Sequence, residues 1–203
     1  MEEDVFKMSK VIGILGDIGS GKSFVAKQFG YPVFNADKEV NKLYEKNKSC
    51  YKKLRNKLPK YVKSYPINKD ELNRAILANR HNLKKIVSVV HPLVRSKMNN
   101  FLRKNNKKKL VVLDIPLLIE NNLNRKKDIL VFVESKKSQI ISRLKKRKNY
   151  NKKIVENLKR LQKKLAYKKK LSTHVIKNDF KIITTKKRVN HIKKIILNER
   201  NSS

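Results

Sequence analysis

The chain has 203 residues and a formal net charge of +37, from 53 lysines and arginines against 16 aspartates and glutamates. This length suits one α/β unit with a real core and room for inserted subdomains. A single cysteine excludes a disulfide framework, and the four histidines lack metal-ligand spacing. The acidic start at Met1–Asp4, with no long apolar run after it, predicts neither a signal peptide nor a transmembrane helix, so we expect a cytoplasmic protein.

The positive charge has three candidate explanations. Lysine and asparagine occur in every segment, and runs such as Lys107–Lys109 and Lys168–Lys170 lack interleaved aromatic residues that would stack on bases. Compositional drift at solvent positions accounts best for this spread. A nucleic-acid role and a general attraction for anionic substrates are the alternatives. We therefore expect no specific nucleic-acid partner and no membrane partner.

The first predicted strand, Val11–Leu15, leads into the sequence GDIGSGKS at residues 16–23, and a helix-like stretch follows from Phe24. This segment matches G-x-x-x-x-G-K-[ST], in which glycines turn backbone N–H groups toward an anion at a helix N-terminus. Lys22 would contact the β- and γ-phosphates, and the Ser23 hydroxyl would bind Mg²⁺. The alternative is a chance glycine turn. The predicted ATP-binding residues here are Asp17, Ile18, Gly19, Ser20, Gly21, Lys22, Ser23 and Phe24.

A second apolar run, Pro32–Asn35, ends at Ala36 and Asp37, and the pattern is then helical from Lys38 to about Asn106. Pro59 and Pro66 break this region into pieces. Two apolar stripes repeat at helical spacing: Leu72, Ala75, Ile76 and Asn79, and then Leu83, Ile86, Val87 and Val90. The region is too long for a simple crossover, so we expect an inserted helical subdomain.

Two buried strands are predicted next, Leu110–Asp114 and Ile129–Val133. Ser135 is the expected cap of the helix after them. On that helix Ile140, Ile141 and Leu144 are expected to face the core, with Arg143 and Arg147 four residues apart on another face.

The remaining pattern continues the alternation of strands and helices. A final strand is predicted at His174–Ile176. The apolar stripes are Ile154, Leu158, Leu161 and Leu165 before it, and Val189, Ile192, Ile195 and Ile196 after it. Such alternation predicts an α/β fold with a mostly parallel sheet flanked by helices.

Several motifs, taken in order from about Val11 to Asp179, resemble the dephospho-CoA kinase family. The phosphate loop alone is generic, whereas His91-Pro92 followed by Ile115-Pro116-Leu117-Leu118 with Glu120 is much more specific. The other matching residues are Asn35-Ala36-Asp37, where the family usually has Asp-Ala-Asp, Leu72-Asn73-Arg74, Leu77, Arg143, Arg147, Gln162, Val175-Ile176 and Asn178.

The resemblance implies a P-loop NTPase-type kinase unit over residues 1–203. Within it lie a helical substrate insert at 38–106, a helical lid at 136–170 and a return to the nucleotide-binding core at 171–203. It also implies transfer of the γ-phosphate of ATP, with Mg²⁺, to the ribose 3′-hydroxyl of dephospho-CoA, the last step of coenzyme A synthesis. The alternatives are another nucleoside or nucleotide P-loop kinase, and a basic nucleic-acid-binding protein with a vestigial nucleotide site. We favour a monomer.

Residue roles follow from the same resemblance. Asp37 would accept the hydroxyl proton, and Lys22 and Arg147 would also be catalytic. Arg143, Arg147 and Asn178 would join the ATP site. The predicted substrate-binding residues are Asp37, Arg74, His91, Pro116, Leu117, Leu118 and Glu120.

Each role has an alternative. Asp37 could instead cap a helix starting at Lys38, and the two arginines could be a solvated basic face. A lone histidine before a proline is otherwise more often a capped core residue. Asp114, at a strand end, could hold Mg²⁺ through water, although family members vary there.

The chain departs from the family pattern in the phosphate loop and near its last strand. Asp17 stands where glycine is usual, so its carboxylate must point away from the phosphates. Phe24 replaces a second hydroxyl residue, and Ser172-Thr173 stand where Ala-Asp is typical.

Overall fold

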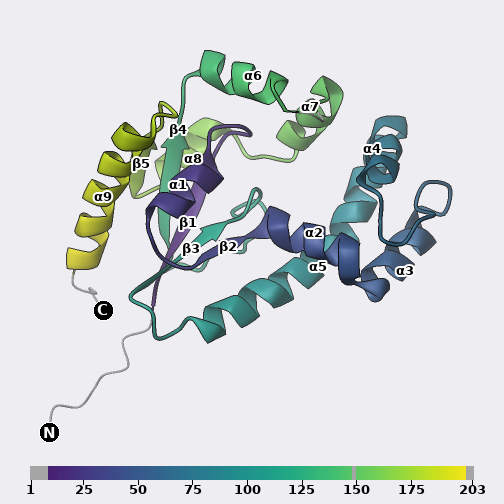
Figure 1. Cartoon of the computed structure of the whole chain (residues 1–203), viewed down its shortest axis with the longest axis horizontal. Coiled ribbons are helices and arrows are strands. Elements are labelled where there is room, and N and C mark those ends of the chain that lie inside the picture. Colours follow the sequence, from purple (N-terminus) through teal and green to yellow (C-terminus); the bar gives the residue numbers. More distant parts are fainter. Residues whose placement is uncertain (1–8, 148–149, 200–203) are drawn as a thin grey trace, which may run out of the picture. The chain divides into compact units, whose positions relative to one another are not determined.

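The computed structural model describes residues 9–147 and 150–199 (Figure 1), whose contacts divide them into two units. The first unit contains the residues up to Asn35, Phe101–Tyr150 and those from Gln162 onward. The second contains Ala36–Asn100 and Asn151–Leu161. The predicted boundaries of a substrate insert at 38–106 and a lid at 136–170 stay predictions.

The first unit is built on a five-stranded sheet in the order β2-β3-β1-β4-β5, in which every neighbouring pair is parallel. This confirms the predicted α/β fold. Gly13 in the central strand lies opposite Leu113 on one side and Leu130 on the other. The strands are β1 (Lys10–Gly16), β2 (Val33–Asn35), β3 (Leu110–Asp114), β4 (Ile129–Glu134) and β5 (His174–Lys177).

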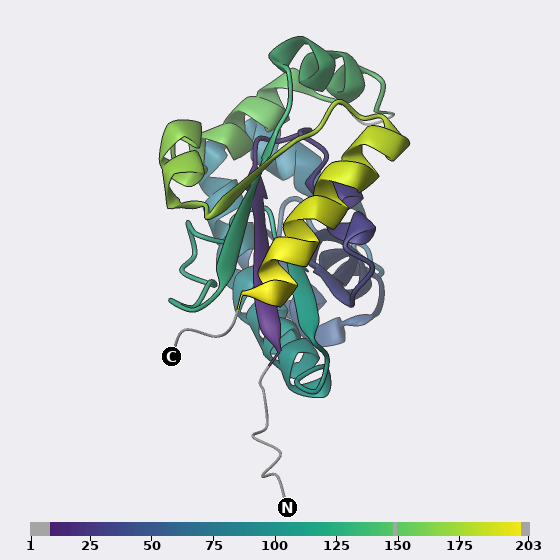
Figure 2. The ribbon, with the colours of Figure 1, turned by 90° about the vertical axis from the view of Figure 1, so that its left-hand side faces the viewer.

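One face of the sheet is covered by α1 (Lys22–Gln28) and α9 (Ile182–Asn198), which also pack against each other. Ile12 and Ile14 of β1 point to this face because side chains alternate along a strand. Figure 2 shows α9 in front of the strands. A further helix, α8 (Leu165–Leu171), packs against β1 and β4. Strand β1 and helix α9 follow from apolar patterns that can be read in the sequence, whereas α8 was not predicted as a separate helix.

The C-terminal helix corrects one predicted core position. Val189 and Ile196 are buried and Ile192 is half-buried, as the helical spacing predicts, but Ile195 is exposed. Residues 189, 192 and 196 share one face at 3.6 residues per turn, and position 195 lies about 100° from residue 196.

Helix α6 (Lys137–Lys145) differs from its prediction at three points. Ile140 and Leu144 are buried, but Ile141 is 43% exposed. The residue before the helix is Lys136, so Ser135 is not its cap; its hydroxyl donates to the Ser20 carbonyl at 2.9 Å. The helix ends at Lys145, so Arg143 lies in its last turn and Arg147 lies beyond it, not on a shared helical face.

The second unit is helical. Helix α4 packs against α7, and its Leu72, Ala75 and Ile76 are buried as predicted. The long helix α5 continues through Pro92, so His91 lies in a helix interior rather than at a cap. The helices that contribute to this unit are α2 (Ala36–Lys46), α3 (Lys48–Lys57), α4 (Lys69–Ala78), α5 (Arg80–Lys104), which runs on into the first unit, and α7 (Lys152–Arg160).

The stripe predicted from Ile154 to Leu165 is wrong as a single helix. Helix α7 ends at Arg160, and Leu165 begins α8 with its side chain exposed. Ile154 and Leu158 are only half-buried. The four apolar residues therefore do not belong to one helix, because the chain leaves the helical conformation between α7 and α8. Periodicity alone does not reveal this break.

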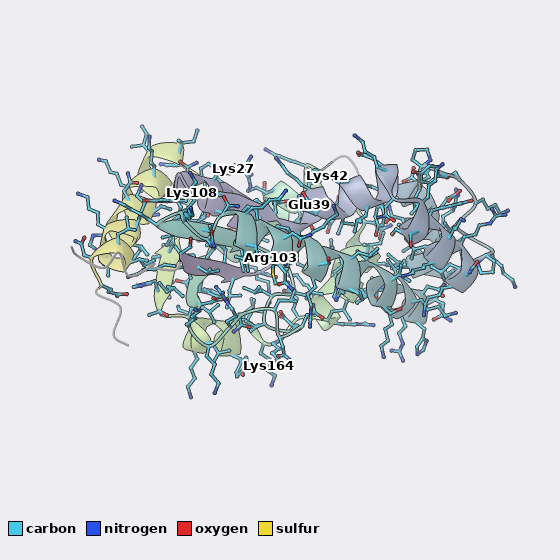
Figure 3. The ribbon with its side chains drawn as sticks, turned by 90° about the horizontal axis from the view of Figure 1, so that it is seen from below. Lys27, Glu39, Lys42, Arg103, Lys108 and Lys164 are labelled. Atoms are coloured by element: carbon cyan, nitrogen blue, oxygen red, sulfur yellow. The ribbon has the colours of Figure 1, made fainter. Side chains whose placement is uncertain are left out.

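Basic side chains are spread over the surface of the described residues. In Figure 3, Lys27, Lys42, Lys108 and Lys164 come from different segments and extend outward. Some lysines have acidic partners, such as Lys42 with Glu39 at 2.6 Å. The predicted absence of a specific nucleic-acid partner stays a prediction.

Across residues 9–147 and 150–199, no helix has the length and apolar character needed to cross a membrane.

Candidate active site

The loop between β1 and α1 has the conformation that its glycines were expected to allow. Gly16, Gly19 and Gly21 have φ angles of 147°, 86° and 88°, a region that residues with a β-carbon rarely adopt. A β-carbon on Gly16 would lie 2.7 Å from the Val133 carbonyl oxygen. On Gly21 it would lie 2.3 Å from the Asn178 Nδ2 atom. Both the backbone angles and the surrounding space therefore require glycine, which argues against a chance glycine turn.

Lys22 folds back across this loop. Its ammonium donates to the Asp17 carbonyl at 2.7 Å and to the Gly16 carbonyl at 3.2 Å. Lys22 is also the first residue of α1, and Ser23, the second, is exposed. A cation and a hydroxyl thus lie at the start of the helix, where backbone N–H groups favour anions.

The Asp17 carboxylate forms a hydrogen bond with a backbone N–H group of the phosphate loop itself. Its Oδ1 atom accepts from the adjacent Ile18 N–H at 2.7 Å. The carboxylate thus competes for one backbone donor of the loop, which is a way in which this departure from glycine can weaken anion binding.

Asn178 clamps the loop from within the core. Its Nδ2 atom donates to the Ser20 carbonyl at 2.8 Å, and its Oδ1 atom accepts from the Phe180 N–H and the Thr185 hydroxyl, each at 3.0 Å. The side chain is buried. Asn178 therefore holds the backbone of the phosphate loop in place, and its membership of the ATP site stays a prediction.

Asp114 and Asn35 end neighbouring parallel strands and lie opposite each other in register. The Asn35 amide donates to the buried Asp114 carboxylate. Because β3 also pairs with β1, Asp114 lies at the same edge of the sheet as the phosphate loop.

Oxygen donors near this edge suit Mg²⁺, which is usually bound by one or two protein groups together with substrate phosphates. The Ser23 hydroxyl and the Asp114 carboxylate are such donors, so the residues present fit the ion. Within the part of the chain that the structure describes, no three His, Cys, Asp or Glu side chains gather into a metal-binding cluster.

Two of the predicted arginines differ in their surroundings. The Arg143 guanidinium lies over the Phe180 ring, 4.3 Å from its centroid. The Arg147 side chain is exposed, and the backbone N–H of this residue donates to the Leu144 carbonyl at 3.1 Å.

The predicted substrate segment 116–120 includes two side chains that are structural. Leu118 is fully buried, and its Cδ2 atom would lie 2.5 Å from a β-carbon on Gly13, so its side chain belongs to the core. The Glu120 side chain is 8% exposed and forms an ion pair at 2.6 Å with Lys168, whose side chain is 1% exposed. Glu120 Oε1 also accepts from the Lys163 N–H at 2.9 Å. Pro116 and Leu117 are half-buried.

Lys168 is a residue that sequence reasoning missed. It stands in a run of three lysines, and such a run indicates a solvated surface. Nothing in the sequence distinguishes Lys168 from Lys169 and Lys170, so no local signal could have found it.

The other predicted residues lie in the second unit. Asp37 is exposed in the first turn of α2, which begins at Ala36, so the expectation of a cap for a helix starting at Lys38 is wrong. Arg74 is exposed on α4, and His91 is half-buried in the interior of α5.

Comparisons with known proteins identify the family of this chain. The family model of dephospho-CoA kinase matches residues 10–184. The dephospho-CoA kinase of Wolbachia pipientis wMel is 38% identical over 130 residues, which cover 62% of this chain and 67% of that protein.

Solved structures show the same fold. A protein of Thermus thermophilus superposes with a TM-score of 0.74 at 28% identity, covering 96% of this chain and all of that one. The dephospho-CoA kinase from Campylobacter jejuni superposes with a TM-score of 0.62 at 18% identity, covering 93% and 98% of the two chains. With a phosphate loop on the central strand of a parallel sheet and a family match over most of its length, the chain belongs to the dephospho-CoA kinase family.

Proposed function

We propose that this protein transfers the γ-phosphate of ATP to the ribose 3′-hydroxyl of dephospho-CoA, forming coenzyme A and ADP. Membership of the family supports the substrate. The observation that supports phosphoryl transfer most strongly is the phosphate loop. Glycines with positive φ shape an anion site in this loop, and Lys22 lies across it.

Phosphoryl transfer needs neutralisation of charge, positioning of both substrates and an acceptor for the hydroxyl proton. The loop's N–H groups and Lys22 would bind the phosphates of ATP. Ser23, with Asp114 acting through water, would hold Mg²⁺, which when bound neutralises phosphate charge. Asp37 would accept the proton; its exposure in the first turn of α2 supports this role.

On the substrate side, Arg74 offers an exposed guanidinium suited to the diphosphate of dephospho-CoA. His91, Pro116 and Leu117 would complete this side. Leu118 would contribute only through its backbone, because its side chain is in the core. Glu120 would act by holding Lys168 and the Lys163 N–H, and so would order the segment beside the substrate.

A substrate panel tests the proposal. With ATP and Mg²⁺, the full-length protein should release ADP faster with dephospho-CoA than with adenosine, AMP or cytidylate, as a coupled assay measures. The product should carry its new phosphate on the ribose 3′ position, which phosphorus NMR can establish. Faster turnover of a plain nucleoside or nucleotide would instead support the alternative kinase class.

Replacing Arg147 tests the catalytic role that is proposed for it. Arg147→Ala should lower kcat roughly 10²-fold with little change in KM for dephospho-CoA, because the guanidinium would act on charge that develops in the transition state. Arg143→Ala should lower kcat less. Lys145→Ala is the matched control, since Lys145 is an exposed cation on the same segment. Equally small effects from all three variants would show that the arginines are only surface charge.

A further inference from the structure

Phe180 has a backbone conformation that is unusual for an aromatic residue. Its φ is 63°, in the left-handed region, where a β-carbon is unfavourable. Such a conformation persists only where the surroundings enforce it, and it often lies near a functional site.

The turn that holds Phe180 is fixed on both sides. The Phe180 N–H donates to Asn178 Oδ1 at 3.0 Å, and the Lys181 N–H donates to Asp179 Oδ1 at 3.1 Å. Arg188 lies 3.3 Å from the second Asp179 oxygen. The Lys181 hydrogen bond, assisted by the Arg188 charge, lowers the pKa of the Asp179 carboxyl, because both interactions favour its ionised form.

The ring of Phe180 lies between the phosphate loop and α6. Its Cε1 atom would be 3.0 Å from a β-carbon on Gly21, the last loop residue before α1. Its face carries the Arg143 guanidinium at 4.3 Å. Helix α6 also contacts the loop directly, because a β-carbon on Gly19 would lie 2.9 Å from Leu144 Cγ.

We propose that Phe180 is a positioning residue of the ATP site, whose ring holds the Arg143 guanidinium beside the phosphate loop. This inference rests on the ATP-binding role proposed for Arg143. Arg143 is exposed, and a long exposed side chain loses much rotamer freedom when it binds an anion. Stacking on a fixed ring removes part of that freedom before ATP arrives, so binding is tighter.

The stack can be tested without any reaction. In the ¹⁵N-labelled full-length protein, the Arg143 Nε–H resonance should be shifted upfield by the ring current of Phe180. It is assigned by its disappearance in Arg143→Lys. Phe180→Tyr should retain the shift, and Phe180→Leu should abolish it. An unshifted resonance in the unsubstituted protein would overturn the proposal, even if a variant failed to fold.

Steady-state kinetics show whether Phe180 positions Arg143 for ATP binding or only supports the fold. Phe180→Leu should raise KM for ATP roughly 5- to 10-fold, a part of the rotamer freedom that one arginine side chain loses on binding, with KM for dephospho-CoA unchanged. Phe180→Tyr should stay within about 2-fold of the unsubstituted enzyme, since its ring keeps the cation–π face. In an Arg143→Ala background, Phe180→Leu should have no further effect, because the two residues would act together.

The outcomes distinguish this inference from the function on which it rests. If Phe180→Leu raised KM for ATP equally in the presence and absence of Arg143, the inference alone would be overturned. The same holds if Arg143→Ala raised KM for ATP and Phe180→Leu did not. An unchanged KM for ATP in Arg143→Ala would overturn the role proposed for Arg143 and this inference with it.

Discussion

Asp37→Asn should lower kcat roughly 10²-fold or more and leave the affinity for ATP nearly unchanged, the usual scale for loss of a general base. Asparagine keeps the size and hydrogen-bonding shape of the side chain but does not take up the hydroxyl proton. The measurement is steady-state turnover with saturating dephospho-CoA, together with calorimetric titration of ATP into the full-length protein.

Glu39→Gln is the matched control. Glu39 shares the first turn of α2 with Asp37 and forms an ion pair with Lys42, so its loss also removes a negative charge from the helix N-terminus. Each variant should cost a similar small amount of stability, about 0.3–1 kcal/mol, but only Asp37→Asn should affect turnover. If Asp37→Asn lowers the melting temperature while the folded enzyme turns over normally, Asp37 serves the helix alone.

Lys168→Met should lower the free energy of unfolding by about 3–5 kcal/mol, because it leaves a buried carboxylate without its cation. The Glu120 and Lys168 side chains are both almost fully buried, and the two charges are 2.6 Å apart. Urea denaturation of the full-length protein measures the change.

Lys169→Met is the control for this pair. Its partner is Glu134, also at 2.6 Å, but the two side chains are 47% and 37% exposed, so the expected loss is at most about 1 kcal/mol. The double variant Lys168→Met, Glu120→Gln should regain much of the lost stability, since no charge is then buried. Equal losses at positions 168 and 169 would contradict this account. A rise in KM for dephospho-CoA in Glu120→Gln with unchanged stability would instead support direct substrate contact.

Several features follow from local sequence alone. The phosphate loop was predictable because its function needs glycine, lysine and serine at fixed spacing, and three glycines do adopt positive φ there. Strands β3 and β4 were predictable because a parallel strand buried on both faces is a continuous apolar run. The family was recognisable from motifs such as His91-Pro92, whose order does not depend on the fold.

Other features depend on contacts between distant parts of the chain. Lys168 is indistinguishable from Lys169 and Lys170 until α8 packs against the sheet and brings it to Glu120. Ser135 was predicted as a helix cap, because a cap is a local motif, but its hydroxyl donates instead to the loop at Ser20.

Sequence by itself determined that this chain has a phosphate loop, a parallel α/β sheet and the motifs of its family, because each is written in neighbouring residues or in a short period. Only the tertiary structure decided which lysine is buried, that Asn178 and Ser135 hold the loop, and that Phe180 lies beneath Arg143. Those roles depend on which surfaces meet after folding. A charged or aromatic side chain has the same local pattern whether it meets solvent, a buried partner or a binding site.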